Sequence, residues 1–288
     1  MGDELKLTKA EFILLTMTAI WGLTFPLIKG AVAYVPPFAF LSMRFFLAVI
    51  VLSFFLKPEF NKKNVKWGLI IGFFLFAGMA CQTIGLMYTK ASRSGFITGF
   101  LVFLVPLFDY LIFKKKPTIF AIIGVFLALG GLYLLSSPEG GGFNIGDFLT
   151  LLSAGFFAFQ VIFIEHSTTR YNGDTIVFFQ IASTFIFSFI ASTLTEKWNF
   201  RIDIPLIVAV IVTGVFATAL ALLMQGKYQK ETTTVRAGII YSMEPVFALF
   251  FSFLILSEKL PEKGIIGGFL VFSGMLISNF KSKEINQE

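Results

Sequence analysis

The chain has 288 residues, of which 56% are hydrophobic and only 14% charged, and its mean hydropathy is +0.84. Because soluble globular chains carry about 25% charged residues, this composition excludes a soluble protein and indicates a polytopic membrane protein. One cysteine and one histidine exclude an intrachain disulfide and argue against a metal site, and the net charge of +6 lies mostly in short loops, so we expect no cofactor and no nucleic-acid partner.

A bilayer core about 30 Å thick takes roughly 20 apolar residues per helix. Ten segments of the chain have this character: 12–34, 36–56, 67–89, 94–113, 117–136, 147–165, 175–195, 204–226, 234–257 and 264–280. With the N-terminus inside, the inner segments hold 15 Lys and Arg residues and the outer loops hold 6. This asymmetry predicts that both termini are cytoplasmic. The first eleven residues mix both charges before a full-length apolar span, so we expect no cleavable signal peptide.

The first spans carry groups that a lipid-facing helix does not need. Arg44 lies near the middle of the second span, where an unpaired charge is costly, so we expect it either at a cavity or in a tie between helices. Lys29 lies late in the first span and could extend to the outer interface. Pro26 and Pro106 release the carbonyls four residues back, and we interpret both prolines as hinges.

The ninth span is interrupted by Glu244-Pro245. An acid in hydrocarbon is costly and is therefore a candidate for a functional role. Pro245 frees the carbonyl of Tyr241 and is the third predicted hinge. Glu244 either carries a proton or contacts a substrate amine, or else it is a structural acid bonded to Arg236 or to a neighbouring helix.

The sequence contains two copies of one unit. The matching segments are Ile122–Leu127 with Ile265–Leu270, Gly131 with Gly274, and Val105-Pro106 with Glu244-Pro245. In the numbering, the first two matches are offset by 143 and the third by 139, which we interpret as a four-residue shortening in the first copy.

Each unit has five spans, an odd number, so the second copy must enter the membrane from the opposite side. We therefore expect an all-α integral membrane protein of ten transmembrane helices, built as two inverted five-helix repeats over residues 12–136 and 147–280. This architecture favours alternating access to a site between the copies near the membrane midplane. Gly264-x-x-x-Gly268 in the tenth span permits close helix contact, either inside the protein or across a homodimer.

Several motifs in order along the chain carry a family resemblance. They are Trp21–Pro26, Arg44–Ala48, Gln82–Ser92, Phe96–Pro106, Arg236–Ala248 and Ser257–Leu260. Together they resemble the drug/metabolite transporter superfamily, and within it the EamA-type ten-helix carriers. The sequence departs from a symmetric pattern at Glu258, because three lysines follow the fourth span where a counterpart would stand.

The resemblance implies a secondary transporter of small metabolites in the cytoplasmic membrane of a prokaryote. Members export amino acids and related compounds, and some import them. It also implies a central cavity lined by helices 1, 3, 4, 6, 8 and 9, with helices 5 and 10 at the periphery.

The candidate site residues are of two kinds. Neutral polar and aromatic side chains in apolar helices are the expected substrate contacts: Trp21, Phe25, Gln82, Tyr88, Gln225 and Tyr241. Glu244 and Arg44 are the expected coupling groups or charge partners. We expect a carrier that moves a small-molecule substrate across the lipid bilayer and is not an enzyme. A membrane-embedded enzyme or a channel is the alternative, although no phosphate-binding loop, protease motif or filter sequence is present.

Overall fold

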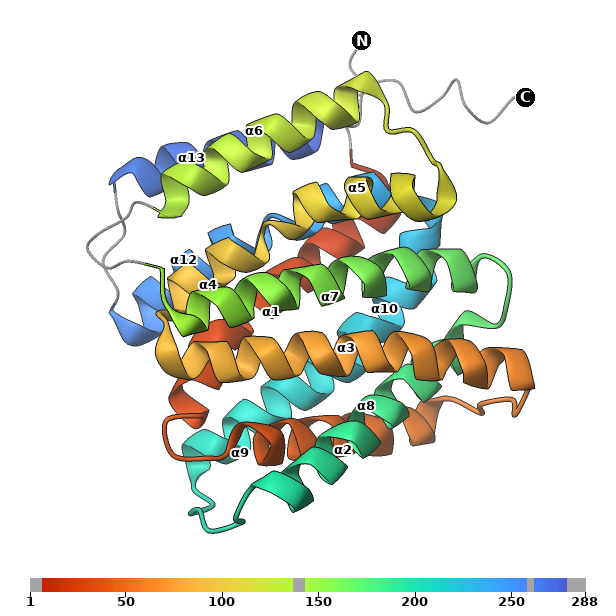
Figure 1. Ribbon diagram of the computed structural model, residues 1–288, viewed down its shortest axis with the longest axis vertical. Coiled ribbons are helices and arrows are strands. Elements are labelled where there is room, and N and C mark those ends of the chain that lie inside the picture. The colour runs from red at the N-terminus through yellow and green to blue at the C-terminus, as the bar shows by residue number, and fades with distance from the viewer. Residues whose placement is uncertain (1–6, 137–142, 258–261, 279–288) are drawn as a thin grey trace.

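The computed structural model describes residues 7–136, 143–257 and 262–278, and all regular structure in these residues is helical (Figure 1). The first half holds α1 (Lys9–Ala31), α2 (Pro37–Phe55), α3 (Lys62–Tyr88), α4 (Ala91–Thr98), α5 (Leu101–Phe113) and α6 (Ile119–Ser136). The second half holds α7 (Ile145–Thr168), α8 (Gly173–Thr195), α9 (Ile204–Ile211), the π-helix η1 (Val212–Leu220), α10 (Ala221–Tyr228), the 3₁₀ turn η2 (Gln229–Glu231), α11 (Thr234–Tyr241), α12 (Glu244–Leu256) and α13 (Glu262–Ile277). Glu258 lies outside the described residues.

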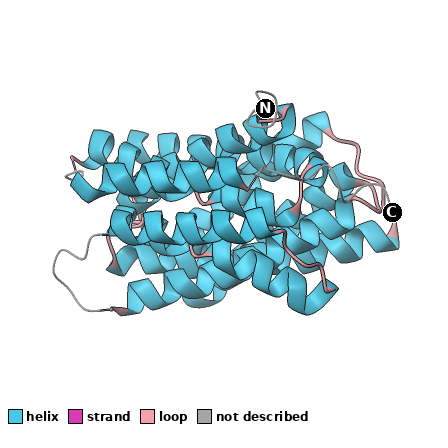
Figure 2. Ribbon diagram, turned by 90° about the horizontal axis from the view of Figure 1, so that it is seen from above, coloured by secondary structure: helices cyan, strands magenta, loops and turns pink. Residues whose placement is uncertain are grey.

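The expected membrane segments are present as helices. Within the described residues, eight helical segments are long and apolar enough to cross a membrane, and Ile119–Leu134 and Ile266–Ile277 are two shorter apolar helices. Large apolar side chains also cover the outside: Phe54 and Phe126 are 82% and 70% exposed. Helices that are apolar on their outer faces and hold polar groups inside are typical of a bundle surrounded by lipid. The bundle is built from helices alone, as Figure 2 shows for the described part of the chain.

The fourth and ninth spans are each broken in the middle, and the two breaks match. A shift of 143 in the numbering carries each bound of α4 and α5 onto the corresponding bound of α11 and α12. Both broken spans end at a residue with left-handed backbone, Lys114 at φ 57° and Ser257 at φ 55°, and the same shift relates these two residues. The breaks therefore belong to the repeat itself.

This register corrects the four-residue shortening that we inferred from the prolines. At a shift of 143, Pro245 corresponds to Val102, and Pro106 corresponds to Leu249. Pro245 stands in the first turn of α12, directly after the break, where proline is well tolerated. Pro106 lies inside α5 and Pro26 lies inside α1, and neither interrupts its helix. The observed breaks lie instead at Gly99–Phe100 and at 242–243.

Helices α6 and α13 lie side by side at one edge of the molecule, as Figure 1 shows. Their contact is reciprocal. A Cβ added to Gly124 would lie 2.7 Å from the carbonyl oxygen of Gly274, and one added to Gly274 would lie 2.6 Å from that of Gly124. A Cβ on Gly131 would meet the Gly267 carbonyl in the same way. This contact is internal, and α13 makes it through Gly267 and Gly274, while Gly268 faces Val246 of α12. The surroundings of Gly264 lie outside what the structure describes, so a contact through Gly264 stays a prediction.

The eighth span differs from its counterpart α3, which is one continuous α-helix. It runs through α9, η1 and α10, and the nine residues Val212–Leu220 form a π-helix. A π-helix turns more widely than an α-helix, and such segments are frequent at functional sites. Here η1 packs against α2, and a Cβ added to Gly214 would lie 2.9 Å from the Arg44 carbonyl oxygen.

Candidate functional site

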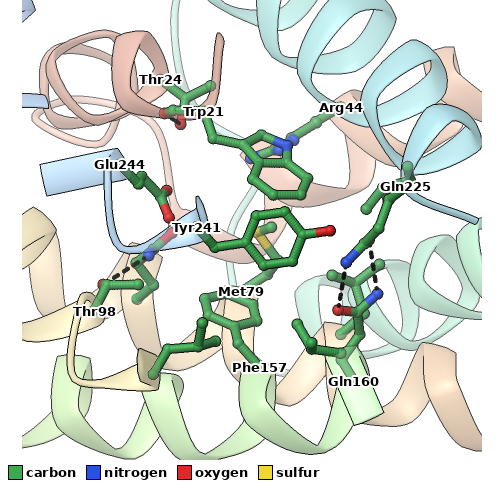
Figure 3. Close-up of a pocket in the computed structure, with 15 residues that line it drawn as sticks. Trp21, Thr24, Arg44, Met79, Thr98, Phe157, Gln160, Gln225, Tyr241 and Glu244 are labelled. Atoms are coloured by element: carbon green, nitrogen blue, oxygen red, sulfur yellow. Dashed lines mark hydrogen bonds between the residues drawn. The ribbon is translucent and has the colours of Figure 1, made fainter. Parts of the chain in front are cut away.

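A cavity lies at the centre of the bundle, between the two repeats (Figure 3). It is lined by Trp21, Thr24, Arg44, Leu75, Met79, Gln82, Thr98, Leu101, Phe157, Gln160, Val161, Leu222, Gln225, Tyr241 and Glu244. These residues come from spans 1, 2, 3, 4, 6, 8 and 9. The helices expected at the cavity are therefore all there, and α2 joins them because it carries Arg44. Among the described residues, helices α6, α8 and α13 contribute none to the lining.

Arg44 and Glu244 are the two charged residues of the lining, and they come from different repeats. The Arg44 side chain is buried, its Nε donates to Thr218 Oγ1 at 2.7 Å, and its guanidinium lies 5.5 Å from the centre of the Phe45 ring. Glu244 is the first residue of α12, where a negative charge is favoured by the partial positive charge of a helix N-terminus. Among the described residues, neither takes part in an ion pair at 4.0 Å or less. Both charges therefore remain available to a solute.

A chain of amides forms one side of the cavity. Gln160 and Gln225 exchange two hydrogen bonds, at 3.1 and 3.3 Å, and Gln225 Nε2 also donates to Gln229 Oε1 at 3.0 Å. The Tyr241 hydroxyl donates to the same oxygen of Gln229 at 3.0 Å, and Gln229 Nε2 donates to the Val161 carbonyl at 2.7 Å. Each amide is thereby paired, as burial in an apolar bundle requires.

Aromatic side chains line the cavity next to this network. Trp21 and Tyr241 meet edge to face with ring centres 5.4 Å apart, and Figure 3 shows Phe157 and Met79 beside the Tyr241 ring. The Trp21 indole donates to the Ala217 carbonyl of η1 at 2.9 Å. The π-helix thus holds both Trp21, through Ala217, and Arg44, through Thr218.

The structure places most of the predicted site residues at this cavity. Trp21, Gln82, Gln225, Tyr241, Arg44 and Glu244 all line it, and Gln82 donates to Thr98 Oγ1 at 3.1 Å. Phe25 and Tyr88 do not line it, which corrects our expectation. Phe25 is 1% exposed and packs behind the cavity wall near Gly95, whereas Tyr88 is the last residue of α3 and is 57% exposed.

One partner assignment is corrected, and a second charged side chain has defined hydrogen-bond partners. Arg236, which we considered as a partner of Glu244, forms an ion pair with Glu11 at 2.7 Å. Lys29, for which we predicted an approach to the outer interface, donates from Nζ to the carbonyls of Leu86 and Thr89 at 2.6 and 2.9 Å. These are carbonyls at the end of α3, where a positive charge is favoured.

Sequence reasoning missed several lining residues, but the repeat contains a signal for some of them. Spans 1 and 6 are related by a shift of 136 in the numbering. At this shift Phe157 corresponds to Trp21, and Gln160 corresponds to Thr24. At the shift of 143, Thr98 corresponds to Tyr241. All of these residues line the cavity. With the correct register, the predicted residues Trp21 and Tyr241 would have pointed to Phe157 and Thr98 in the other repeat. No group of three or more His, Cys, Asp or Glu side chains suited to a metal occurs in the described part of the chain.

The sequence matches the EamA-like transporter family over residues 8–137 and again over residues 144–280. The chain belongs to the EamA-like transporter family. It is therefore a multi-pass membrane protein of the drug/metabolite transporter superfamily, and its membership indicates transport rather than catalysis.

Named relatives agree with this membership. An uncharacterized transporter of Archaeoglobus fulgidus is 37% identical over 280 residues, which cover 97% of this EamA-like chain and 89% of the relative. A protein of Salmonella typhimurium named "Probable amino-acid metabolite efflux pump" is 24% identical, with coverage of 94% and 95%. A solved crystal structure superposes with a TM-score of 0.77 at 18% identity, covering 96% of this chain and 99% of that one, which shows a shared fold.

Proposed function

We propose that this protein is a secondary carrier that moves small amino-acid-like metabolites across the cytoplasmic membrane by alternating access, in the direction of export. The observation that carries the proposal is the pair of opposite charges, Arg44 and Glu244, which face one central cavity from different repeats. A solute that bridges the two charges would also bridge the two repeats.

The cavity fits the chemistry of a zwitterion. The guanidinium of Arg44 suits a carboxylate, because its remaining N–H groups can donate in a bidentate manner. The Glu244 carboxylate suits an amine. Trp21, Tyr241 and Phe157 provide apolar and aromatic surface for the remainder of the solute, and pockets of this kind combine apolar walls with few oriented polar groups. The name of the Salmonella typhimurium relative supports both the substrate class and the direction.

Alternating access requires two units that move relative to each other around the site. We take these units to be the two repeats, residues 12–136 and 147–280, since inverted repeats are a recurrent basis of this mechanism. The breaks at Gly99–Phe100 and 242–243, together with Pro26, Pro106 and Pro245, are the proposed points of bending. With both termini cytoplasmic, the end of the bundle that holds residues 89–93 faces outward.

A homodimer remains a prediction.

The test is counterflow of labelled amino acids into proteoliposomes that contain the purified full-length protein and an excess of unlabelled solute. The expected result is saturable uptake that requires internal solute. A thermal-shift screen of amino acids and related compounds would select the solute, since a bound ligand raises the unfolding temperature.

Glu244→Gln is the diagnostic variant, because it preserves shape and removes the charge. Loss of a buried charge partner costs about 2–5 kcal/mol, so the apparent affinity should fall about 30-fold or more while the unfolding temperature stays near that of the wild type. The matched control is Glu231→Gln, an exposed acid away from the cavity. Unchanged counterflow in Glu244→Gln would contradict the proposed role of the charge pair.

A further inference from the structure

An ion-paired cluster links the two repeats at the end of the bundle where α4 and α7 begin. Arg93 of α4 pairs with Asp147 of α7 at 2.7 Å, and Thr89 Oγ1 donates to the same carboxylate at 2.9 Å. Asp147 is fully buried, and it also accepts the backbone N–H of Asn144 at 2.9 Å.

A second cluster of the same composition lies where α1 and α11 begin. Arg236 of α11 pairs with Glu11 of α1 at 2.7 Å, and Thr232 Oγ1 donates to the same carboxylate at 3.3 Å. Glu11 is fully buried, and it accepts the backbone N–H of Thr8 at 2.9 Å.

The two clusters are repeat-related copies. Thr89 and Arg93 correspond to Thr232 and Arg236 at the shift of 143, and Glu11 corresponds to Asp147 at the shift of 136. Helix capping accounts for each acid, because both acids form capping boxes with the residue that precedes their helix. Capping does not account for an arginine and a threonine that reach the acid from the other repeat.

Each cluster also lies between the cavity and one end of the bundle. Trp21 and Phe157, which line the cavity, each follow their cluster's acid by ten residues, about 15 Å of helix. Tyr241 and Thr98 line it as well, and each follows its cluster's arginine by five residues, about 7.5 Å. In Figure 1 the starts of α1 and α7 lie toward opposite ends of the helices.

We propose that these clusters are the two gates of the transport cycle, the Asp147 gate at one face of the membrane and the Glu11 gate at the other. The proposal rests on the proposed carrier function. Separating the repeats at one end must break the link at that end, while the link at the other end persists. Water that enters the opened end solvates the released acid and arginine, which offsets the loss of the ion pair.

The two gates differ in the side chains that surround them. Beside the Asp147 gate, the hydroxyls of Ser94 and Thr150 are hydrogen-bonded at 3.2 Å. Their counterparts beside the Glu11 gate are Ala237 and Leu14, whose side chains cannot form such a bond. At the end of the bundle that holds the Glu11 gate, Lys115 and Glu165 form a further ion pair between the repeats at 3.1 Å, so each end has an additional link of its own.

The test is the labelling of a single cavity cysteine with an impermeant maleimide applied from one face at a time. The reporter is Met79→Cys in a Cys81→Ala background, since Met79 lines the cavity and Cys81 is the chain's one cysteine. Arg93→Gln and Arg236→Gln each remove a link between the repeats and leave both capping boxes intact. Arg93→Gln should raise the labelling rate from the Asp147 face, and Arg236→Gln should raise it from the Glu11 face, by roughly fivefold or more in each case.

Arg93→Lys and Arg236→Lys are the matched controls, because they keep the positive charge and should return labelling towards the wild-type rate. Labelling that rises from both faces in either Gln variant, or from neither face, would overturn the gates. So would a fall in unfolding temperature with no change in labelling. Because labelling needs no substrate, one-sided changes would support the gates even if counterflow of amino acids failed.

Discussion

The broken spans α4–α5 and α11–α12 have the same backbone and different side chains at the same positions. Their bounds, their breaks and their left-handed terminal residues coincide at the shift of 143. Beside the breaks, however, Thr98 and Leu101 in the first copy correspond to Tyr241 and Glu244 in the second, and all four residues line the cavity. A symmetric backbone provides two equivalent directions of opening, whereas the asymmetric side chains give the cavity its chemistry.

The second spans show the same contrast. Arg44 of α2 corresponds to Gln180 of α8 at the shift of 136. Arg44 lines the cavity and donates to Thr218, while Gln180 is fully buried, lies outside the cavity lining and has neither side-chain amide atom hydrogen-bonded to the described residues. The two copies thus differ at this position, because Arg44 has a hydrogen-bond partner and Gln180 has none among the described residues.

The largest expected effect follows from making the first copy resemble the second. Arg44→Gln removes the positive charge of the cavity and the hydrogen bond from the guanidinium to Thr218 Oγ1. A buried hydrogen bond from a charged donor contributes about 1.5–3 kcal/mol. We expect counterflow to be lost and the unfolding temperature of the detergent-solubilised protein to fall. Wild-type counterflow in this variant would show that the charge asymmetry has no role in transport.

A smaller effect is expected where the copies are alike, at the α6–α13 contact. A Cβ at Gly131 would overlap the Gly267 carbonyl, so Gly131→Ala should destabilise the protein by about 1–3 kcal/mol through overpacking. Its neighbour is the matched control, because a Cβ at Gly130 has no atom within 4 Å. Gly130→Ala should be neutral or stabilising by up to about 1 kcal/mol, since alanine favours a helix. Equal unfolding temperatures for the two variants would contradict the reciprocal glycine contact.

The smallest effect is expected at Gln180, where a buried amide without partners can be removed. Gln180→Leu retains the approximate volume and eliminates two unpaired polar atoms, and replacing buried polar groups by apolar groups of the same shape is nearly neutral or stabilising. We expect an unfolding temperature equal to or above that of the wild type, with counterflow retained. A marked loss of stability would indicate that Gln180 has a partner during the transport cycle.

The fold followed from the sequence because ten apolar segments and an odd number of helices per copy leave little choice of architecture. The register of spans 4 and 9 did not follow. The matched prolines differ from the true register by four residues, close to one helical turn of about 3.6 residues. In a uniformly apolar helix such a slip keeps the same face and the same composition, so the pattern cannot reveal it.

The candidate site residues were predictable where a polar side chain stands out in an apolar helix. They were not predictable among the aromatic residues, because these are common throughout the chain. Arg44, Glu244 and Gln225 are unusual in apolar helices, and all three line the cavity. Tyr88 is one of many aromatics, and its side chain lies at a helix end. The π-helix of the eighth span left no signal, because its sequence is as apolar as that of an α-helix.

The reciprocal seam between α6 and α13 has an evolutionary consequence. The Gly124–Gly274 approach becomes the Gly131–Gly267 approach when the copies are exchanged. One copy therefore carries both halves of the contact. An unfused five-helix ancestor could have formed the same seam with a second molecule inserted in the opposite orientation. In the single chain the pairing is permanent, and the two halves carry different residues such as Arg44 and Glu244.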